Sequence, residues 1–236
     1  MGKLGCLKGE ALNCKETNVE KIKMRRPSVG ILFVASLLIG AGCAGTGQTV
    51  HLDVPQKQAA ALSLDPAVRI VIEPFDDRRA EKTRLGLRTH LWGGVTYFDL
   101  AGERPGVVLA QALADRLSTR GWKDRAWTVR VASSVGATTS QDADIVISGQ
   151  LLDFSANAKS RVFSTVVNTS SKLVITARNL SDQSTTTRNV EGSQRGTLFW
   201  FCDEDVQLLL AATLKDDFDR YLADTKIEQK AVRTAR

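Results

Sequence analysis

The sequence has few of the residues that metal sites and nucleophilic catalysts require. Its 236 residues include only two histidines, His51 and His90, and four cysteines. These cannot supply a Cys/His metal set, since no Cys-x-x-Cys pair and no pair of histidines at helical spacing is present. Neither a Gly-x-Ser-x-Gly motif nor a phosphate-binding glycine loop occurs. The sequence therefore predicts no metal ion, no cofactor and no catalytic residue.

An apolar run long enough to cross a membrane is also missing. Residues 29–41 form the main apolar stretch, and their 13 residues fall short of the roughly 20 that a transmembrane helix needs. A basic region begins with Met-Arg-Arg at residues 24–26, and Gly-Ala-Gly at residues 40–42 ends the stretch. A basic start, a short apolar run and small residues are the three parts of an export signal. We therefore expect residues 24–42 to be a signal peptide.

Cys43 directly follows the small residues of this signal. Residues 39–43, Ile-Gly-Ala-Gly-Cys, resemble the lipobox, at which lipoprotein signal peptidase cleaves after diacylglycerol is attached to the thiol. The lipobox usually has Leu three residues before the cysteine, where this chain has Gly40. The sequence predicts a lipoprotein that is lipidated on Cys43. The alternative is an ordinary secretory signal followed by an incidental cysteine.

Residues 1–23 are polar and mixed in charge, so we expect an over-extended reading frame with the true start at Met24. Ala44 follows the lipidated cysteine, and an Asp at that position retains enterobacterial lipoproteins in the inner membrane. Its absence favours the periplasmic face of the outer membrane. Two or three acyl chains on the cysteine would meet the requirement that stable anchoring takes more than one chain.

The formal charge of +6 is concentrated before the expected cleavage point. Residues 1–42 carry seven Lys or Arg and three Glu, which leaves 25 basic and 23 acidic residues in the mature chain. Nucleic-acid binding requires a clustered basic surface, so we expect no nucleic-acid partner. Of the cysteines, only Cys202 would remain unmodified after cleavage and lipidation, which excludes an intramolecular disulfide.

The mature chain divides into a tether, one domain and a tail. Residues 43–66 lack periodicity and are typical of a flexible tether, whereas residues 226–236 are expected to be a basic, disordered tail. Residues 67–225 are expected to form a single periplasmic domain. Apolar periodicity in it predicts strands at 68–75, 127–131 and 145–154, a hairpin of 164–178 and 184–195, and helices at 106–120 and 203–224. This order predicts an α+β fold, with a mostly antiparallel or mixed sheet of about four to five strands and two helices packed on one face.

Residues 76–105 form an unusually long connection between the first strand and the first helix. One interpretation is a loop that binds a partner or ligand. Its candidate residues are Asp77, Arg78, His90, Trp92, Tyr97 and Phe98. The interpretation that we favour is a hairpin around Gly93 and Gly94 that extends the sheet. For Phe-Trp-Phe at residues 199–201 we expect packing in the core, with an exposed interface as the alternative.

Residues 144–224 combine a strand pair, Val-Glu-Gly at 190–192 and a closing helix, and in this they resemble the YajG-type uncharacterised outer-membrane lipoproteins. The helix at 107–121, which ends in Arg-Gly-Trp at 120–122, resembles the first helix of that family. More distantly, the layout is similar to the α/β fold of lipoprotein transport auxiliaries, peptidoglycan-synthase activators and the N-terminal domain of TolB. The resemblance implies a protein that binds other envelope components and catalyses no reaction.

The leading hypothesis is a non-enzymatic outer-membrane lipoprotein, anchored by acyl chains on Cys43, that docks to another cell-envelope protein or complex. A second hypothesis is an auxiliary subunit of lipid or glycan transport, which holds an apolar ligand between sheet and helices or near the aromatic loop. A third is a cell-wall enzyme that uses Asp76 and Asp77. Adjacent strand residues point to opposite faces, so this pair is poorly placed for catalysis.

Overall fold

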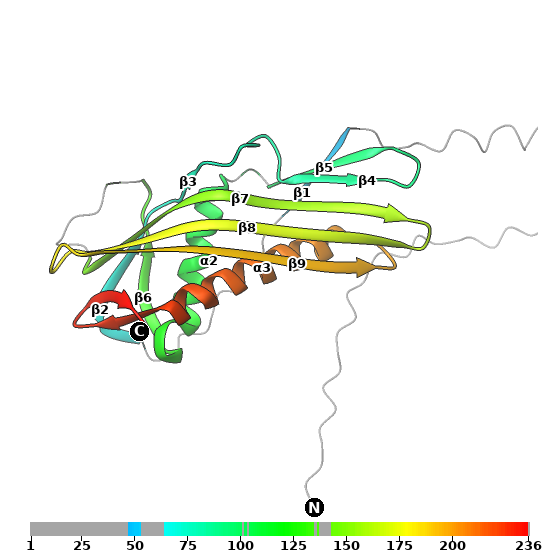
Figure 1. The fold of residues 1–236 in the computed structure, drawn as a ribbon. Coiled ribbons are helices and arrows are strands. Elements are labelled where there is room, and N and C mark those ends of the chain that lie inside the picture. The colour runs from blue at the N-terminus through cyan, green and yellow to red at the C-terminus, as the bar shows by residue number, and fades with distance from the viewer. Residues whose placement is uncertain are drawn as a thin grey trace, which may run out of the picture. The chain divides into compact units, whose positions relative to one another are not determined.

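The computed structural model describes residues 47–52, 64–100, 102, 104–134, 136 and 143–235 (Figure 1). The predicted signal peptide and Cys43 lie outside the described residues. The strands are β1 (Gln48–Leu52), β2 (Leu64–Ile72), β3 (Asp76–Asp77), β4 (Gly86–Thr89), β5 (Val95–Leu100), β6 (Ala126–Val131), β7 (Ile145–Arg161), β8 (Ser164–Asn179), β9 (Thr185–Leu198), β10 (Thr225–Glu228) and β11 (Ala231–Thr234). The helices are α2 (Pro105–Arg120), the short 3-10 turn η1 (Trp122–Asp124) and α3 (Asp203–Asp224).

One long strand, β7, organises the main sheet. One edge of β7 pairs antiparallel with β8, which in turn pairs with β9. Its other edge pairs with three shorter parallel strands, first β2, then β3 and finally β4. With β1, β5 and β6 added at the sides, the sheet has nine strands. The α+β class and the mixed sheet are confirmed, but the predicted four to five strands are too few, because the 76–105 connection supplies β3, β4 and β5 and the predicted tether supplies β1.

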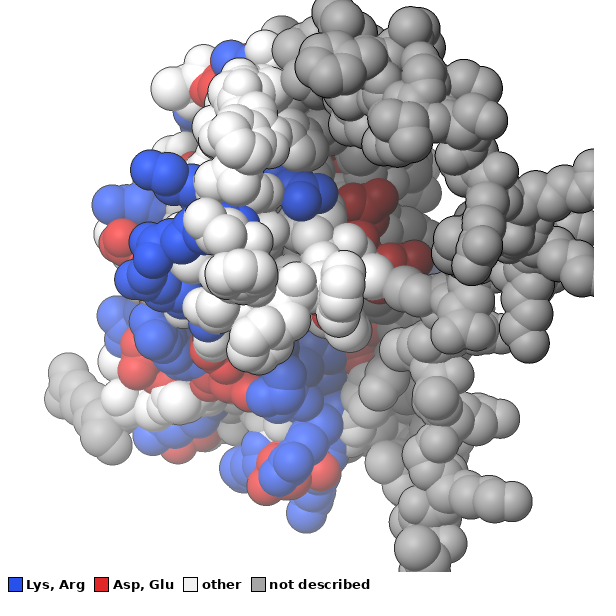
Figure 2. Space-filling view, turned by 90° about the vertical axis from the view of Figure 1, so that its right-hand side faces the viewer, with Lys and Arg blue, Asp and Glu red and all other residues white. Residues whose placement is uncertain are grey.

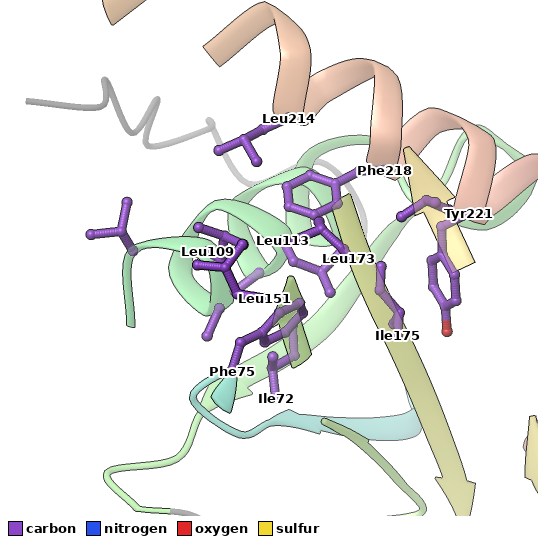
Figure 3. Close-up of a cluster of buried hydrophobic side chains, with 14 of the residues drawn as sticks. Ile72, Phe75, Leu109, Leu113, Leu151, Leu173, Ile175, Leu214, Phe218 and Tyr221 are labelled. Atoms are coloured by element: carbon purple, nitrogen blue, oxygen red, sulfur yellow. The ribbon is translucent and has the colours of Figure 1, made fainter. Parts of the chain in front are cut away.

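The two predicted helices cover one face of this sheet (Figure 1). Helix α2 buries the stripe Leu109, Leu113 and Leu117, which recurs every four residues and so lies on one side of the helix. Figure 3 shows Leu109 and Leu113 meeting Leu214 and Phe218 of α3 above the sheet. Burying such a side chain fully contributes roughly 1.5 to 3 kcal/mol relative to leaving it exposed. These side chains fill the space between sheet and helices, where the transport hypothesis would have placed an apolar ligand.

The C-terminal segment is a β-hairpin, so the prediction of a disordered tail is wrong. Strands β10 and β11 pair antiparallel, and Ile227 and Val232 are buried against the core. The carboxamide of Asn179, at the end of β8, donates to the Val232 carbonyl at 3.1 Å and accepts from its N–H at 2.8 Å. Each strand has only four residues, too few for a reliable periodicity, and the hairpin depends on contacts with distant parts of the chain.

Part of the predicted tether is also ordered. Residues 48–52 form β1, which pairs parallel with β5, and Leu52 is fully buried. A flexible assignment is therefore wrong for these five residues and for residues 64–66, which begin β2. The partner strand lies more than 40 residues away in the sequence, so no local pattern indicated the pairing. Within the described residues, no helix is long and apolar enough to cross a membrane.

Candidate functional site

Strands β4 and β5, within the 76–105 connection, form a hairpin around Gly93 and Gly94 that extends the sheet, which confirms the favoured interpretation. Thr89 at the end of β4 lies opposite Lys159 near the end of β7, and Gly86 lies opposite Ala156. A Cβ atom on Gly86 would lie 1.9 Å from the carbonyl oxygen of Ala156, so only glycine permits this close approach. The hairpin is thereby fixed beside the turn that joins β7 to β8.

Two of the predicted binding residues, Tyr97 and Phe98, hold this hairpin in place. Phe98 is fully buried and stacks on Phe201, with ring centroids 6.2 Å apart. The guanidinium of Arg84 lies 4.7 Å from the centroid of the Tyr97 ring, a cation–π contact. Neither aromatic ring is therefore presented to a partner as a free surface.

Asp77 is also structural, because it pairs with Arg79. The Arg79 side chain is buried, and its Nε and Nη2 donate to the two Asp77 carboxylate oxygens at 3.0 and 2.9 Å. Burial by itself would raise the pKa of Asp77, but hydrogen bonds and charge from Arg79 outweigh burial and lower it. Arg78 is exposed and its Nε donates to Asp76 at 2.5 Å. Acidic and basic side chains of this segment thus pair with one another, and the pair with the buried Arg79 stabilises the chain between β3 and β4.

The turn between β4 and β5 projects Trp92 into solvent. Nε2 of His90 lies 2.8 Å from Oγ1 of Thr96, and this hydrogen bond links the two sides of the turn. Burial, and then the charge of Arg88, lower the pKa of His90. Gly93 has a φ of +89°, a left-handed conformation that glycine adopts without strain. Trp92 has no such role in the turn and is 88% exposed.

The turn between β7 and β8 is more unusual in sequence. Its two central residues, Val162 and Phe163, are 67% and 83% exposed. Two-residue hairpin loops are normally built from Gly, Asn or Asp, whose backbones suit the turn. A β-branched residue and a phenylalanine help neither the turn nor the core at this place. Large apolar side chains left in water at a turn therefore indicate a candidate interaction surface.

A third apolar projection precedes helix α3. Phe199 and Trp200 are 81% and 87% exposed, so the prediction that they pack in the core is wrong. Of this aromatic cluster only Phe201 is half-buried, because it stacks on Phe98. An exposed interface was the alternative interpretation of residues 199–201. The local sequence does not indicate which of the three consecutive aromatic rings faces the core.

Strand pairing brings the three projections to one end of the sheet. Thr89 lies opposite Lys159, and Thr165 lies opposite Leu198, so β4, β7, β8 and β9 reach the same end. This is the right-hand end in Figure 1, and Figure 2 looks onto it. We call this surface the aromatic tip, and it consists of Leu91, Trp92, Val162, Phe163, Phe199 and Trp200. These are six of the nine large hydrophobic side chains that are exposed among the described residues.

A groove of about 700 Å³ opens between the β7–β8 turn and the segment before α3. Val162, Phe163, Phe199 and Trp200 line it, together with two arginines and no acidic residue. Arg88 lies 3.9 Å above the Phe201 ring and donates from Nε to Ser160 Oγ at 3.0 Å. Burial lowers the pKa of Arg88, with Asp203 opposing, but an arginine stays cationic at neutral pH. Figure 2 shows uncharged side chains over the centre of the tip, with Lys and Arg beside them.

This arrangement is suited to binding an apolar or amphipathic surface. Aromatic side chains carry a large apolar area, and the arginines can pair with anionic groups at its border. Among the described residues, no group of three or more His, Cys, Asp or Glu side chains is placed to hold a metal ion. Of the six residues predicted for a binding loop, only Trp92 belongs to the tip, and the other apolar side chains of the tip come mainly from two turns outside that loop.

Comparison with known proteins gives no family for this chain. No protein-family model matches it, and no curated protein matches it in sequence. A Xanthomonas campestris protein has a TM-score of 0.41 at 10% identity, with 75% of this chain and 92% of that chain covered. A putative neuraminyllactose-binding hemagglutinin homologue from Helicobacter pylori has a TM-score of 0.41 at 7% identity, covering 77% and 94%. A Neisseria meningitidis lipoprotein has a TM-score of 0.31 at 12% identity, covering 63% and 96%. Similarity at this level assigns neither a family nor a function, and the resemblance to YajG-type lipoproteins stays a prediction.

Proposed function

We propose that this chain is an outer-membrane lipoprotein, anchored through Cys43, whose periplasmic domain works without catalysis by docking to another component of the cell envelope. The aromatic tip is the observation that carries this proposal. Monomeric proteins rarely keep contiguous exposed apolar patches unless these bind a protein, a ligand or a membrane. Six such side chains from three separate turns at one end of a sheet therefore indicate an interaction surface.

The composition of the tip supports docking rather than chemistry. Its side chains are aromatic and aliphatic, and the nearby Arg88 is engaged with Phe201 and Ser160. General acid–base or nucleophilic catalysis needs paired titratable groups within hydrogen-bonding reach of a substrate. An apolar ligand, as in the transport hypothesis, would bind in the groove at the tip, because side chains already fill the space between sheet and helices.

The lipid anchor is tested by a Cys43→Ala variant expressed in a Gram-negative host. We expect an uncleaved precursor without acyl chains, because lipoprotein signal peptidase acts only after diacylglycerol is attached to the cysteine. The parent should be a mature, acylated species that begins at Cys43 and fractionates with the outer membrane. Intact mass spectrometry and membrane fractionation measure both, and a Cys202→Ala variant should behave like the parent. Normal cleavage of the Cys43→Ala protein would instead show an ordinary secretory signal.

Docking through the tip is tested by photo-crosslinking in cells. A crosslinking phenylalanine analogue is placed at Phe163 or Trp200, and at Ser193 as a control on the exposed polar face of β9. We expect the two tip positions to crosslink to another envelope component at several times the yield of the control position, since only the tip side chains would be covered by that component. Equal yields, or crosslinks only from Ser193, would exclude the tip as the docking surface.

A further inference from the structure

The first described residues of the chain lie at the aromatic tip. The Gly47 N–H donates to the Val95 carbonyl at 2.9 Å, and β1 then runs parallel to β5. Val95 lies opposite Thr89, at the end of β4 that borders the turn carrying Trp92. The N-terminal end of β1 is therefore placed beside the tip and not at the opposite end of the sheet.

The short chain before Gly47 limits how far the tip can be from the lipid anchor. Cys43 precedes Gly47 by four residues, which span at most about 14 Å when fully extended. Strand β7 has 17 residues, and at about 3.3 Å per residue it is roughly 55 Å long. The tip must therefore lie close to the membrane that holds the acyl chains of Cys43. The opposite end of the sheet reaches the same membrane only if the domain lies on its side.

The face of the sheet that the helices leave open carries polar side chains, and this argues against a domain that lies on this face at the membrane. Thr169 of β8 points toward the helices and bonds Thr213 of α3 at 2.7 Å, so its neighbours Asn168 and Ser170 point to the other face. A groove on this open face is lined by serine and asparagine side chains together with Arg195. Laying this face on a bilayer would remove hydroxyl and amide groups from water, whereas seating the tip removes aromatic rings.

The side chains of the tip match the headgroup region of a bilayer. Tryptophan is enriched where membranes meet water, because its ring is largely apolar and its indole N–H can still find a hydrogen-bond partner. Arg88 and Arg161 line the groove beside the aromatic residues. Arginine pairs with phosphate groups, including those of phospholipids, and keeps its charge at the interface while its stem lies among apolar groups.

We propose that the aromatic tip is seated in the headgroup region of the membrane in which Cys43 is acylated, with Trp92, Phe163 and Trp200 inserted among the lipids. This inference rests on the proposed lipid anchor and names the partner of the docking surface. The acyl chains hold the protein on the membrane, and the tip sets its orientation. The domain then stands upright, and the β10–β11 hairpin and the opposite end of the sheet face the periplasm.

The four tryptophans of the chain give a direct test of this position. Trp122 and Trp127 are buried in the core, whereas Trp92 and Trp200 are almost fully exposed at the tip. The mature acylated protein is reconstituted in vesicles of phosphatidylethanolamine and phosphatidylglycerol whose acyl chains are brominated near the headgroup. We expect the bromine atoms to quench a large part of the tryptophan emission. Each of Trp92→Ser and Trp200→Ser should lose about half of that quenching, and the double variant nearly all of it.

Leu152→Ser is the matched control, because Leu152 is an exposed apolar residue in the middle of β7. It should keep the full quenching, and equal thermal unfolding temperatures would show that the tip variants fold. Two outcomes overturn the inference while the lipid anchor stands. One is parent protein that floats with the vesicles but shows no quenching by brominated lipid, with Trp92 and Trp200 open to acrylamide. The other is the same lack of quenching together with crosslinks from the tip to an envelope protein in cells. Protein that fails to float with the vesicles at all would contradict the proposed anchor itself.

Discussion

Replacing Asp217 with Asn is expected to raise the free energy of unfolding at pH 7 by about 2 to 3 kcal/mol. Asp217 lies on α3, fully buried against the sheet. Ser171 of β8 donates to Oδ2 at 2.5 Å, and Oδ1 has no hydrogen-bond partner among the described residues. Burial raises the pKa of this carboxyl group to about 6, although Ser171 and Arg220 oppose the shift. An ionised carboxylate at this position therefore destabilises the fold.

The sign of the pH dependence follows from proton binding. Between pH 3.8 and about 6 the folded protein keeps the Asp217 proton while the unfolded chain loses it. The free energy of unfolding therefore falls as the pH rises through this window, and the loss is complete above about pH 6. Asn carries no charge in either state, so Asp217→Asn removes this loss. Below pH 4 the variant and the parent should be similarly stable.

Urea denaturation of the mature protein between pH 4 and 8 measures this difference. Asp216→Asn serves as the control, since Asp216 is the preceding residue but is only half-buried and accepts a hydrogen bond from Gln194 at 2.5 Å. The control should show only a small part of this gain, because the charge of Asp216 raises the pKa of Asp217 much less than burial does. If the curves of parent and Asp217→Asn ran parallel over this whole range, the carboxyl group of Asp217 would not have a raised pKa.

The second large effect is expected for Asn179→Ala, which should lower the free energy of unfolding by about 2 to 4 kcal/mol. Asn179 is fully buried, and its carboxamide bonds both the N–H and the carbonyl of Val232 as well as Ser184 Oγ. Alanine leaves these buried polar groups of Val232 without partners, and their lost hydration is then not compensated. The C-terminal hairpin should loosen before the rest of the domain.

Urea denaturation gives the size of this effect, and hydrogen exchange gives its location. The amides of Ile227 and Val232 should exchange much faster in Asn179→Ala, while those of the β7–β8 pair should change less. Asn189→Ala is the control, because Asn189 is an exposed asparagine on β9 and its loss should cost little. Unchanged protection at Val232 would mean that Asn179 does not hold the hairpin.

The elements that could be predicted from the sequence are those with a long local pattern. The stripe on α2 repeats over about two turns and the apolar face of α3 over about four, so periodicity alone identifies them. The β8–β9 hairpin was predicted because two Thr- and Val-rich segments flank a turn of polar residues. The signal and Cys43 are likewise linear motifs, and they stay predictions because they lie outside the described residues.

The elements that could not be predicted depend on partners far away in the sequence. Strands β1, β3, β10 and β11 have two to five residues, and each becomes stable only when paired or packed against distant parts of the chain. Asp77 shows the same limit for the candidate site. Its sequence context is that of an exposed charged loop, yet the burial of Arg79 makes it part of the structure.

The sequence by itself determined that this chain has two amphipathic helices, several strands and unusual aromatic residues in its turns. Only the tertiary structure decided that Trp92, Phe163 and Trp200 share one surface, because they come from turns separated by up to 108 positions in the chain. Whether a turn residue is buried depends on where the neighbouring strands end, and strand pairing sets that through hydrogen bonds between distant segments. A local pattern carries no information about such pairings, so the surface formed by these three turns emerges only in the folded domain.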